Sequence, residues 1–271
     1  MAVTLVSAVL DLGIVIAFAL TAIFLKAIDG RGFIASTAVG YTVLMGGGPG
    51  WFVIVAVFFV LGVGFTWYKY EYKEKLGSAQ EKGGARNWPN ILANGGLASL
   101  FALCELTLGG HLFGVLFLGC ISTSAADTVA TELGLLNEGN PRLITNPTKT
   151  VPPGTSGGVT PLGFTGALLA SVVIGVMALF LRIIPAGPVV ILVCAVGGLV
   201  GAAFDSLLGA KVQRKGYCPV CLRETESLHH CGEKTVVTSG LPFLENNLVN
   251  LTATFVGALA ALGLALVLSV A

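Results

Sequence analysis

Long apolar stretches constrain this chain more than any other feature of its sequence. A helix needs about 20 apolar residues to cross the hydrocarbon layer of a bilayer, and eight stretches approach that length. The mean hydropathy is +0.88, and only 11% of the 271 residues are charged, against about 25% in a soluble domain. The sequence therefore predicts an all-α integral membrane protein, with residues 1–271 forming one polytopic domain.

The eight candidate spans differ in how clearly they cross the membrane. The second is short, and the Gly46-Gly47-Gly48-Pro49-Gly50 turn joins it to the third. If this pair forms a re-entrant hairpin, fewer helices cross, so we expect about seven to eight spans in one bundle. The candidates are residues 3–25, 33–48, 51–68, 91–108, 111–134, 160–181, 186–209 and 247–270.

The positions of Lys and Arg predict the orientation of these spans. Cytoplasmic loops carry the excess of basic residues in membrane proteins. Placing loops 26–32, 69–90, 135–159 and 210–246 inside puts 14 of the 15 basic residues there, and leaves only Arg182 outside. Both termini are then extracytoplasmic, and any site in the long loops faces the cytoplasm. The net charge of +1 indicates no nucleic-acid partner.

Acidic residues near the inner ends of two spans indicate a buried site. Charges inside a bilayer are costly and usually functional. Ser124 and Asp127 share one helix face of the fifth span, and Asp127 lies roughly 10 Å below its cytoplasmic end. Asp205 lies at a similar depth in the seventh span. Two carboxylates presented alike are typical of Mg²⁺ ligands.

Asparagines line the same depth on two other spans. Asn94 belongs to the fourth span, and Asn247 and Asn250 belong to the eighth. They can either face the site or form hydrogen bonds between helices, a role that Asn commonly has in membranes. Both interpretations remain open from the sequence.

A glycine-rich loop precedes the sixth span. It contains Gly154, Thr155, Ser156, Gly157 and Gly158. Such a loop lets backbone N–H groups approach a phosphate beside a helix N-terminus, although it can also be a simple turn. There is no Walker A motif, so the chain is not a P-loop enzyme. Arg142 and Lys149, in the same loop, carry positive charges that a phosphate would attract.

Basic residues also cluster in loop 69–90. Their positions fit either contact with lipid headgroups or binding of an anionic substrate at the membrane surface. The cluster consists of Lys69, Lys73, Lys75, Lys82 and Arg86.

Three cysteines and two histidines predict a zinc knuckle over residues 218–231. Cys218 and Cys221 form a CxxC pair, and His229, His230 and Cys231 follow. This spacing suits a tetrahedral Cys₃His site, which would be structural because four protein ligands leave no open position. Of the two histidines, we expect His229 to be the ligand, because adjacent residues such as His230 and Cys231 rarely reach one ion. A redox pair or unliganded thiols are the alternatives.

Several segments, taken together, resemble a known family. It is the integral-membrane family that includes the phytyl-phosphate kinase of plant tocopherol biosynthesis and many archaeal homologues, related to CTP-dependent polyprenol and dolichol kinases. The similarity runs from about residue 60 to the C-terminus. The matching segments are 94–96, 124–134, 141–145, 151–159, 204–209 and 245–250.

The resemblance implies transfer of a nucleotide γ-phosphate, with CTP as the expected donor, to phytyl or geranylgeranyl phosphate. The partners are then a nucleoside triphosphate, an isoprenyl monophosphate and the bilayer of the cell membrane. Asp127 and Asp205 would hold Mg²⁺, with Glu132 as a candidate third acid for the metal and Lys149 as a further catalytic residue. Acceptor phosphate would bind Lys69, Lys73 and Arg86. Nucleotide and phosphate would bind Asn94, Glu132, Arg142, Gly154, Thr155, Ser156, Gly157, Gly158, Asn247 and Asn250.

Two other functions fit parts of the pattern. A CTP-dependent cytidylyltransferase would use the same carboxylates but would attack the α-phosphate and make a CDP-lipid. A transporter would place its site near the midplane and show broken helices in both halves. The polar residues here gather at one membrane face, which favours an enzyme.

Overall fold

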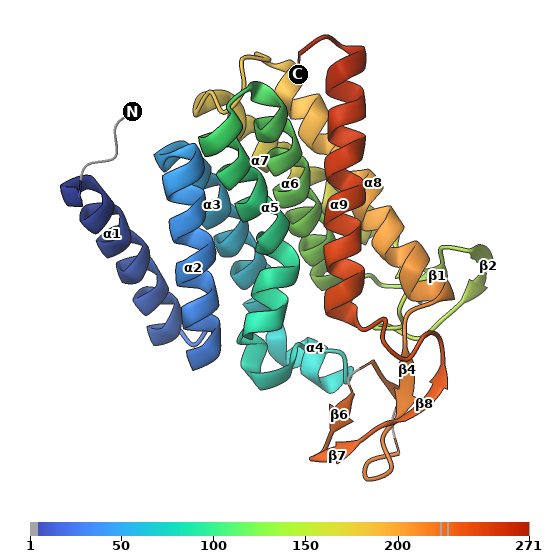
Figure 1. Ribbon diagram of the computed structural model, residues 1–271. Coiled ribbons are helices and arrows are strands. Elements are labelled where there is room, and N and C mark those ends of the chain that lie inside the picture. Colours follow the sequence, from blue (N-terminus) through green and yellow to red (C-terminus); the bar gives the residue numbers. More distant parts are fainter. Residues whose placement is uncertain (1–4, 223, 227, 271) are drawn as a thin grey trace.

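The computed structural model describes residues 5–222, 224–226 and 228–270. Its long helices run alternately up and down the bundle (Figure 1). They are α1 (Leu5–Phe24), α2 (Gly30–Gly47), α3 (Pro49–Trp67), α5 (Trp88–Leu108), α6 (His111–Gly134), α7 (Pro161–Phe180), α8 (Val189–Lys211) and α9 (Asn246–Val267). The short helix α4 (Tyr70–Lys75) and the 3₁₀ turn η1 (Glu81–Gly84) lie between α3 and α5.

Seven helices of the described chain are long and apolar enough to cross a membrane, all of the long ones except α2. This confirms the all-α membrane fold. Helix α2 is continuous over 18 residues, about 27 Å at 1.5 Å per residue, and packs against α1, α3 and α5. Between α2 and α3, Gly48 has a φ of 82°, a conformation that glycine adopts without strain.

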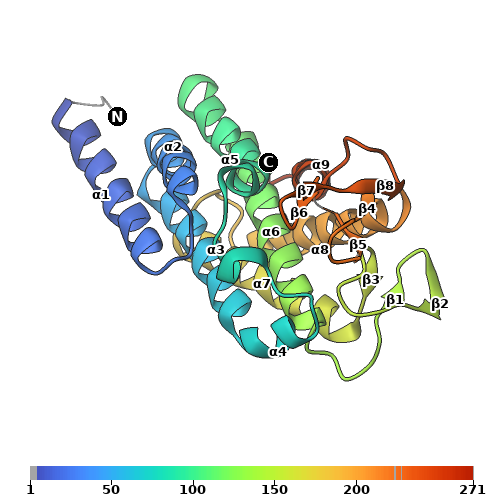
Figure 2. The ribbon, with the colours of Figure 1, turned by 90° about the horizontal axis from the view of Figure 1, so that it is seen from below.

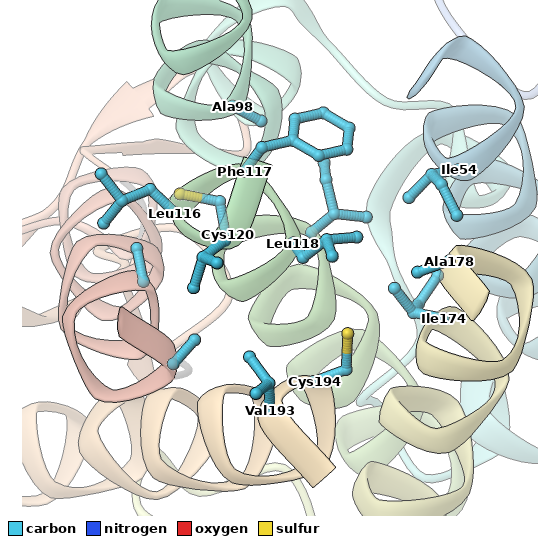
Figure 3. Packing of buried hydrophobic residues seen from close by; sticks show 14 of the residues in the cluster. Ile54, Ala98, Leu116, Phe117, Leu118, Cys120, Ile174, Ala178, Val193 and Cys194 are labelled. Atoms are coloured by element: carbon cyan, nitrogen blue, oxygen red, sulfur yellow. The ribbon is translucent and has the colours of Figure 1, made fainter. Parts of the chain in front are cut away.

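Helix α6 is the centre of the bundle. It packs against α3, α5, α7, α8 and α9. Figure 3 shows Phe117, Leu118 and Cys120 of α6 among side chains of the neighbouring helices, such as Ile54 of α3 and Ile174 of α7. Small residues bring these backbones close: a Cβ on Gly119 would lie 2.6 Å from Ala258 Cα, so α6 and α9 meet where only glycine fits. This contact fixes the polar faces of these helices relative to one another.

The connections that carry short strands lie together at one end of the bundle, opposite the end where α9 finishes (Figure 1). One antiparallel sheet has the order β2-β1-β3 and another has the order β5-β4-β8, while β6 and β7 form a hairpin. The strands are β1 (Arg142–Leu143), β2 (Asn146–Thr150), β3 (Gly158–Val159), β4 (Lys215–Tyr217), β5 (Glu224–Thr225), β6 (His229–His230), β7 (Glu233–Lys234) and β8 (Val236–Ser239). The cytoplasmic location of this end remains a prediction from the basic residues.

Candidate active site

Two carboxylates from different helices form the centre of the candidate site. Asp127 lies on α6 and Asp205 on α8, and these helices pack against each other. The two carboxylates are close enough for the charge of Asp127 to act on Asp205. With its nitrogen turned toward Asp205, Asn250 of α9 donates to Oδ2 at 3.1 Å and to the carbonyl of Asn246 at 3.0 Å. The structure therefore brings three of the sequence-predicted residues together.

The glycine-rich loop packs on α8 one turn beyond Asp205. A Cβ on Gly209 would lie 3.1 Å from the Gly157 nitrogen and 3.3 Å from Ser156 Cβ. Gly157 has a φ of 76°, and a Cβ there would lie 2.6 Å from the Ala210 nitrogen. Because residues four apart share a helix face, the loop backbone packs on the face of α8 that also carries Asp205, one turn further along the helix. This is the arrangement that a phosphate chain bridging metal and loop requires.

The loop retains hydrogen-bond donors for a ligand. The N–H groups of Thr155 and Gly158 are used within the loop, at 3.2 Å to the Pro152 carbonyl and 2.9 Å to the Thr155 carbonyl. Within the described residues, no such bond engages the N–H groups of Ser156 and Gly157. Thr160 Oγ1 caps α7 by accepting from the Gly163 nitrogen at 3.0 Å. The free donors therefore belong to the loop itself.

Three polar residues that the sequence analysis missed extend the site toward the loops. Gln213 Nε2 donates to Glu226 Oε2 at 2.7 Å and lies 3.5 Å from Asn246 Oδ1. The charge of Glu226 also acts on Asp205. Burial raises the pKa of Glu226 to about 7, against the opposing effects of Lys215 and the Gln213 hydrogen bond. Glu226 is therefore a third acidic group near the two aspartates.

Asn94 links α5 to the site through the backbone. It is buried, its Nδ2 donates to the Asn90 carbonyl at 2.9 Å, and its own carbonyl accepts from Ser124 Oγ at 2.9 Å. Ser124 lies three residues before Asp127, so α5 is tied to α6 next to the carboxylates. Asn247 lies half-buried in the first turn of α9, and no hydrogen bond within the described residues joins it to Asp127 or Asp205.

Comparison with known proteins supports this architecture. Residues 13–258 match the family described as "Integral membrane protein DUF92". The chain belongs to this family. That result confirms the family expected from the sequence motifs, and it covers the helices that carry Asp127, Asp205 and Asn250.

Relatives of this DUF92 protein occur in plants and archaea. Protein PGR of Arabidopsis thaliana is 32% identical over 248 residues, which are 83% of this chain and 84% of the relative. Uncharacterized membrane protein MJ0933 of Methanocaldococcus jannaschii is 33% identical over 193 residues, 70% of this chain and 77% of the relative. Protein VTE6, chloroplastic, of Arabidopsis thaliana is 31% identical over 173 residues, 62% of this chain and 51% of the relative. No solved structure matches.

The structure separates Glu132 and Lys73 from this cluster. Glu132 is 3% exposed and Lys73 is 0% exposed, and the two side chains form an ion pair. Lys73 Nζ also donates to the carbonyls of Phe65 and Thr66 at 2.8 and 2.7 Å. An ammonium has three donors, and all three are engaged. Lys73 therefore has no donor left for an acceptor phosphate, and Glu132 is engaged with Lys73 instead of a metal ion.

Three other predicted cations lie on the surface of the protein. Lys69 is exposed, with its ammonium 5.6 Å from the centre of the Tyr68 ring. Arg142 is exposed and its Nη1 donates to the Pro147 carbonyl at 2.7 Å. Lys149 lies on β2, all of whose residues are exposed. The structure does not bring these side chains into contact with the aspartates, because Lys69 is exposed at the start of α4 and the β1–β2 hairpin that carries Arg142 and Lys149 projects from the bundle (Figure 1).

Arg86, in contrast, points into the bundle. Its backbone is held by the Ala27 carbonyl and by the Asp29 nitrogen, at 2.9 and 3.1 Å. Its guanidinium lies 5.6 Å from the centre of the Phe58 ring. A Cβ on Gly62 would lie 2.3 Å from the Arg86 guanidinium. Burial lowers the pKa of Arg86 to about 10, and the charge of Glu132 acts in the opposite direction.

The cysteine cluster forms as a set of four ligands. The sulfurs of Cys218, Cys221 and Cys231 and a ring nitrogen of His230 all lie within 4.8 Å of one another. His230 Nδ1 is 3.3 Å from both Cys221 Sγ and Cys231 Sγ. A hydrogen bond from the Cys221 backbone is the largest of the effects that lower the pKa of Cys218 to about 6, which favours the thiolate that metals bind.

The choice of histidine in this cluster differs from the sequence-based expectation. His230 joins the three cysteines, while His229 is exposed on the β6–β7 hairpin. Cys231 has a φ of 52°, so the chain turns sharply between β6 and β7. This turn lets the adjacent residues His230 and Cys231 direct their side chains toward the same point, which residues in a regular strand or helix rarely do.

Proposed function

We propose that this protein is a Mg²⁺-dependent isoprenyl-phosphate kinase. It transfers the γ-phosphate of a nucleoside triphosphate, with CTP as the expected donor, to phytyl or geranylgeranyl phosphate. The observation that carries the proposal is the meeting of Asp127 and Asp205 beside a loop with free N–H donors. The motif resemblance to the phytyl-phosphate kinase family and the relative named VTE6 support the isoprenoid acceptor.

The residues of the site fit a magnesium ion. Mg²⁺ is usually held by one or two carboxylates together with substrate phosphate oxygens, and Asp127 and Asp205 supply the two carboxylates. The bound ion would neutralise charge on the phosphates of the nucleotide. Asn250, which donates to Asp205 at 3.1 Å, would orient that carboxylate. Ser156 and Gly157 would donate to phosphate oxygens.

The reaction needs positioning more than acid–base chemistry. An oxygen of the lipid monophosphate forms a bond to the γ-phosphorus, and the bond from that phosphorus to the β–γ bridging oxygen breaks. The nucleoside diphosphate leaves, and the lipid becomes a diphosphate. A phosphate monoester is already a nucleophile at neutral pH, so the chain has to supply alignment and charge neutralisation. The location near helix ends suits a lipid headgroup meeting a soluble nucleotide.

We also propose that Cys218, Cys221, His230 and Cys231 bind a structural zinc ion. Three sulfurs and one nitrogen are a typical tetrahedral zinc set, with no open position for catalysis. The loop they close carries Glu226, which reaches Gln213 and acts on Asp205. Zinc would therefore fix the position of this loop, and with it Glu226, beside the candidate site.

A transfer assay tests the kinase proposal. Purified full-length protein is incubated with γ-labelled CTP, Mg²⁺ and geranylgeranyl phosphate, and the products are identified by mass. We expect label in the isoprenyl diphosphate and release of CDP. A CDP-lipid with pyrophosphate would instead establish a cytidylyltransferase. No product with any nucleoside triphosphate would refute both and favour transport.

Two variants and a matched control connect this activity to the site. Asp127→Asn and Asp205→Asn should each lower the rate by 100-fold or more, roughly the loss expected when electrostatic stabilisation of a transition state is removed. Asp11→Asn makes the same chemical change on α1, away from the cluster, and should leave the rate within about twofold of the wild type. Near-normal activity of either site variant would show that the metal assignment is incorrect.

A further inference from the structure

A second feature of the bundle is an apolar cavity between its first helices. Its walls come from α1, α2, α3 and α5, with Ile121 of α6 at the inner side. They include Ala19, Ala22, Val39, Phe58 and Gly95. The space enclosed between these walls is about 70 Å³, several times the roughly 10–15 Å³ that one water molecule needs, and it opens at a mouth on the surface of the bundle.

Helix α1, which forms one wall of the cavity, makes few contacts with the rest of the bundle. Helix α1 packs mainly on α2 and stands at the edge of the bundle (Figures 1 and 2). Phe18 of α1 makes edge-on contacts with Phe52 and Phe59 of α3, at ring-centre distances of 5.7 and 5.5 Å. The opposite side of α1 exposes large apolar residues such as Val9 and Ile14. The cavity is therefore covered by a lipid-facing helix that few contacts hold.

The polar groups of this cavity are concentrated along α5. Arg86, Asn90 and Asn94 all line it, and their spacing of four residues places them along one edge of α5 and the turn before it. Among the described lining residues, Arg86 is the one with a charge. The cavity thus has an apolar body and a cationic end at the side of the bundle where the loops lie.

This polar edge leads to the carboxylates. Asn94 lines the cavity, and its carbonyl accepts from Ser124 Oγ at 2.9 Å. Ser124 lies on α6 three residues before Asp127, so about one turn of α6 separates the residue bonded to the cavity wall from Asp127. The glycine-rich loop contacts α8, the helix that carries Asp205. The cavity and the loop therefore lie against different helices of the candidate site.

We propose that this cavity binds the hydrocarbon chain of an isoprenyl phosphate, whose phosphate lies between Arg86 and Asn94. The inference rests on the proposed kinase function and names the chain-binding part of that site. A cation at one end of an apolar cavity complements an anionic head on an apolar tail. Arg pairs with phosphate through a planar, bidentate fork. Burying the chain among Ala, Val and Phe side chains supplies affinity in proportion to chain length.

Labelling of the wild-type protein tests the cavity without requiring turnover. The probe is geranylgeranyl phosphate with a photoreactive diazirine near the end of its chain, added to the purified full-length protein in detergent. We expect labelled peptides from α1 and α3 that contain Ala19 or Phe58. Labels spread over the outer faces of α7 and α9 would overturn the inference.

A matched pair of variants sharpens the test. Ala19→Phe fills the cavity from α1, where Ala19 is 2% exposed, while Ala17→Phe adds the same ring to the exposed face of α1. We expect Ala19→Phe to lower labelling and to raise KM for geranylgeranyl phosphate about tenfold or more, because several chain carbons lose their contacts. KM for dimethylallyl phosphate should rise much less in Ala19→Phe, because its short chain makes fewer contacts in the cavity, and Ala17→Phe should resemble the wild type. Equal behaviour of the two variants would refute the assignment.

Competition distinguishes an isoprenyl chain from an ordinary bilayer lipid. Excess geranylgeranyl phosphate should suppress labelling in the cavity, and excess dioleoyl phosphatidic acid should not. Equal suppression by both would show a general lipid site and overturn the inference. The two proposals fail separately: a labelled cavity without phosphate transfer refutes the kinase, and phosphate transfer without label in the cavity refutes the chain site.

Discussion

The buried Lys73–Glu132 pair yields the sharpest prediction about stability. Lys73→Met removes an ammonium that Glu132 and two backbone carbonyls contact. It leaves a carboxylate that is 3% exposed, with the Thr66 hydroxyl donating at 3.0 Å as its remaining neutral partner. Removing one partner of a buried ion pair costs about 3–5 kcal/mol. Arg86 acts on the same carboxylate, so we expect the lower end, about 3 kcal/mol.

A double variant separates the lost pair from other effects of the substitution. Lys73→Met combined with Glu132→Gln removes both charges, while the amide can still accept from Thr66. We expect the double variant to recover about 2 kcal/mol of the loss, because no charge remains buried alone. Lys75→Met changes an exposed lysine of the same helix and should alter the free energy of unfolding by less than about 0.5 kcal/mol.

Unfolding followed by tryptophan fluorescence in detergent measures these differences. A loss of about 3 kcal/mol corresponds to a drop in melting temperature on the order of 10 °C. The prediction is refuted if Lys73→Met and Lys75→Met have the same melting temperature. It is also refuted if adding Glu132→Gln to Lys73→Met lowers stability further instead of restoring it. A normal melting temperature with a raised KM for the acceptor phosphate would instead support the substrate-binding role that the sequence predicted for Lys73.

Three further outcomes are expected. Replacing Cys218 and Cys221 by Ser should lower the melting temperature, while the reaction rate of the protein that remains folded changes little. Elemental analysis of the wild type should find about one zinc per chain. Freshly purified protein without zinc would contradict the zinc assignment. The pKa of Glu226 is about 7 in the folded protein, against an ordinary value of 4.5. The folded state therefore binds this proton more tightly than the unfolded state. As a result, Glu226 destabilises the fold increasingly as the pH rises from 4.5 to 7, and fully above pH 7. Glu226→Gln should therefore raise stability in EDTA at pH 8, by at most about 3 kcal/mol, and should have little effect near pH 4; an effect of the same size at both pH values would refute the titration. Gly209→Ala places a Cβ 3.1 Å from the Gly157 nitrogen and should displace the loop, whereas the added Cβ of Gly64→Ala meets nothing within 4 Å. Only Gly209→Ala should therefore raise KM for the nucleotide, by about tenfold. Equal KM values for the two variants would show that the loop does not bind the nucleotide.

The spans could be predicted from the sequence because they depend on a local property. A run of apolar residues crosses a bilayer whatever its neighbours are, and seven of the eight predicted spans meet that criterion in the structure. Helix periodicity likewise placed Ser124 and Asp127 on one face of α6. Asn246 could have been found in the same way, since it lies four residues before Asn250 and the structure joins the two through a 3.0 Å bond.

Other parts of the site depend on contacts between distant segments. Lys73 and Glu132 are 59 residues apart, and no local pattern indicates that they neutralise each other instead of binding phosphate. Glu226 lies in a loop without helix periodicity, and only the fold brings it to Gln213 and Asp205. His230 instead of His229 joins the cysteines because of a single turn at Cys231.

The sequence by itself thus determined the membrane class, the helices, the family and the placement of the two aspartates near the ends of their helices, since each depends on residue type and short-range spacing. The tertiary structure decided which cations are free and which are paired, and it showed that the glycine-rich loop contacts α8 beside Asp205. It also revealed the cavity that ends at Arg86. These features depend on the direction of side chains across helix contacts, which is set by close packing between segments far apart in the chain.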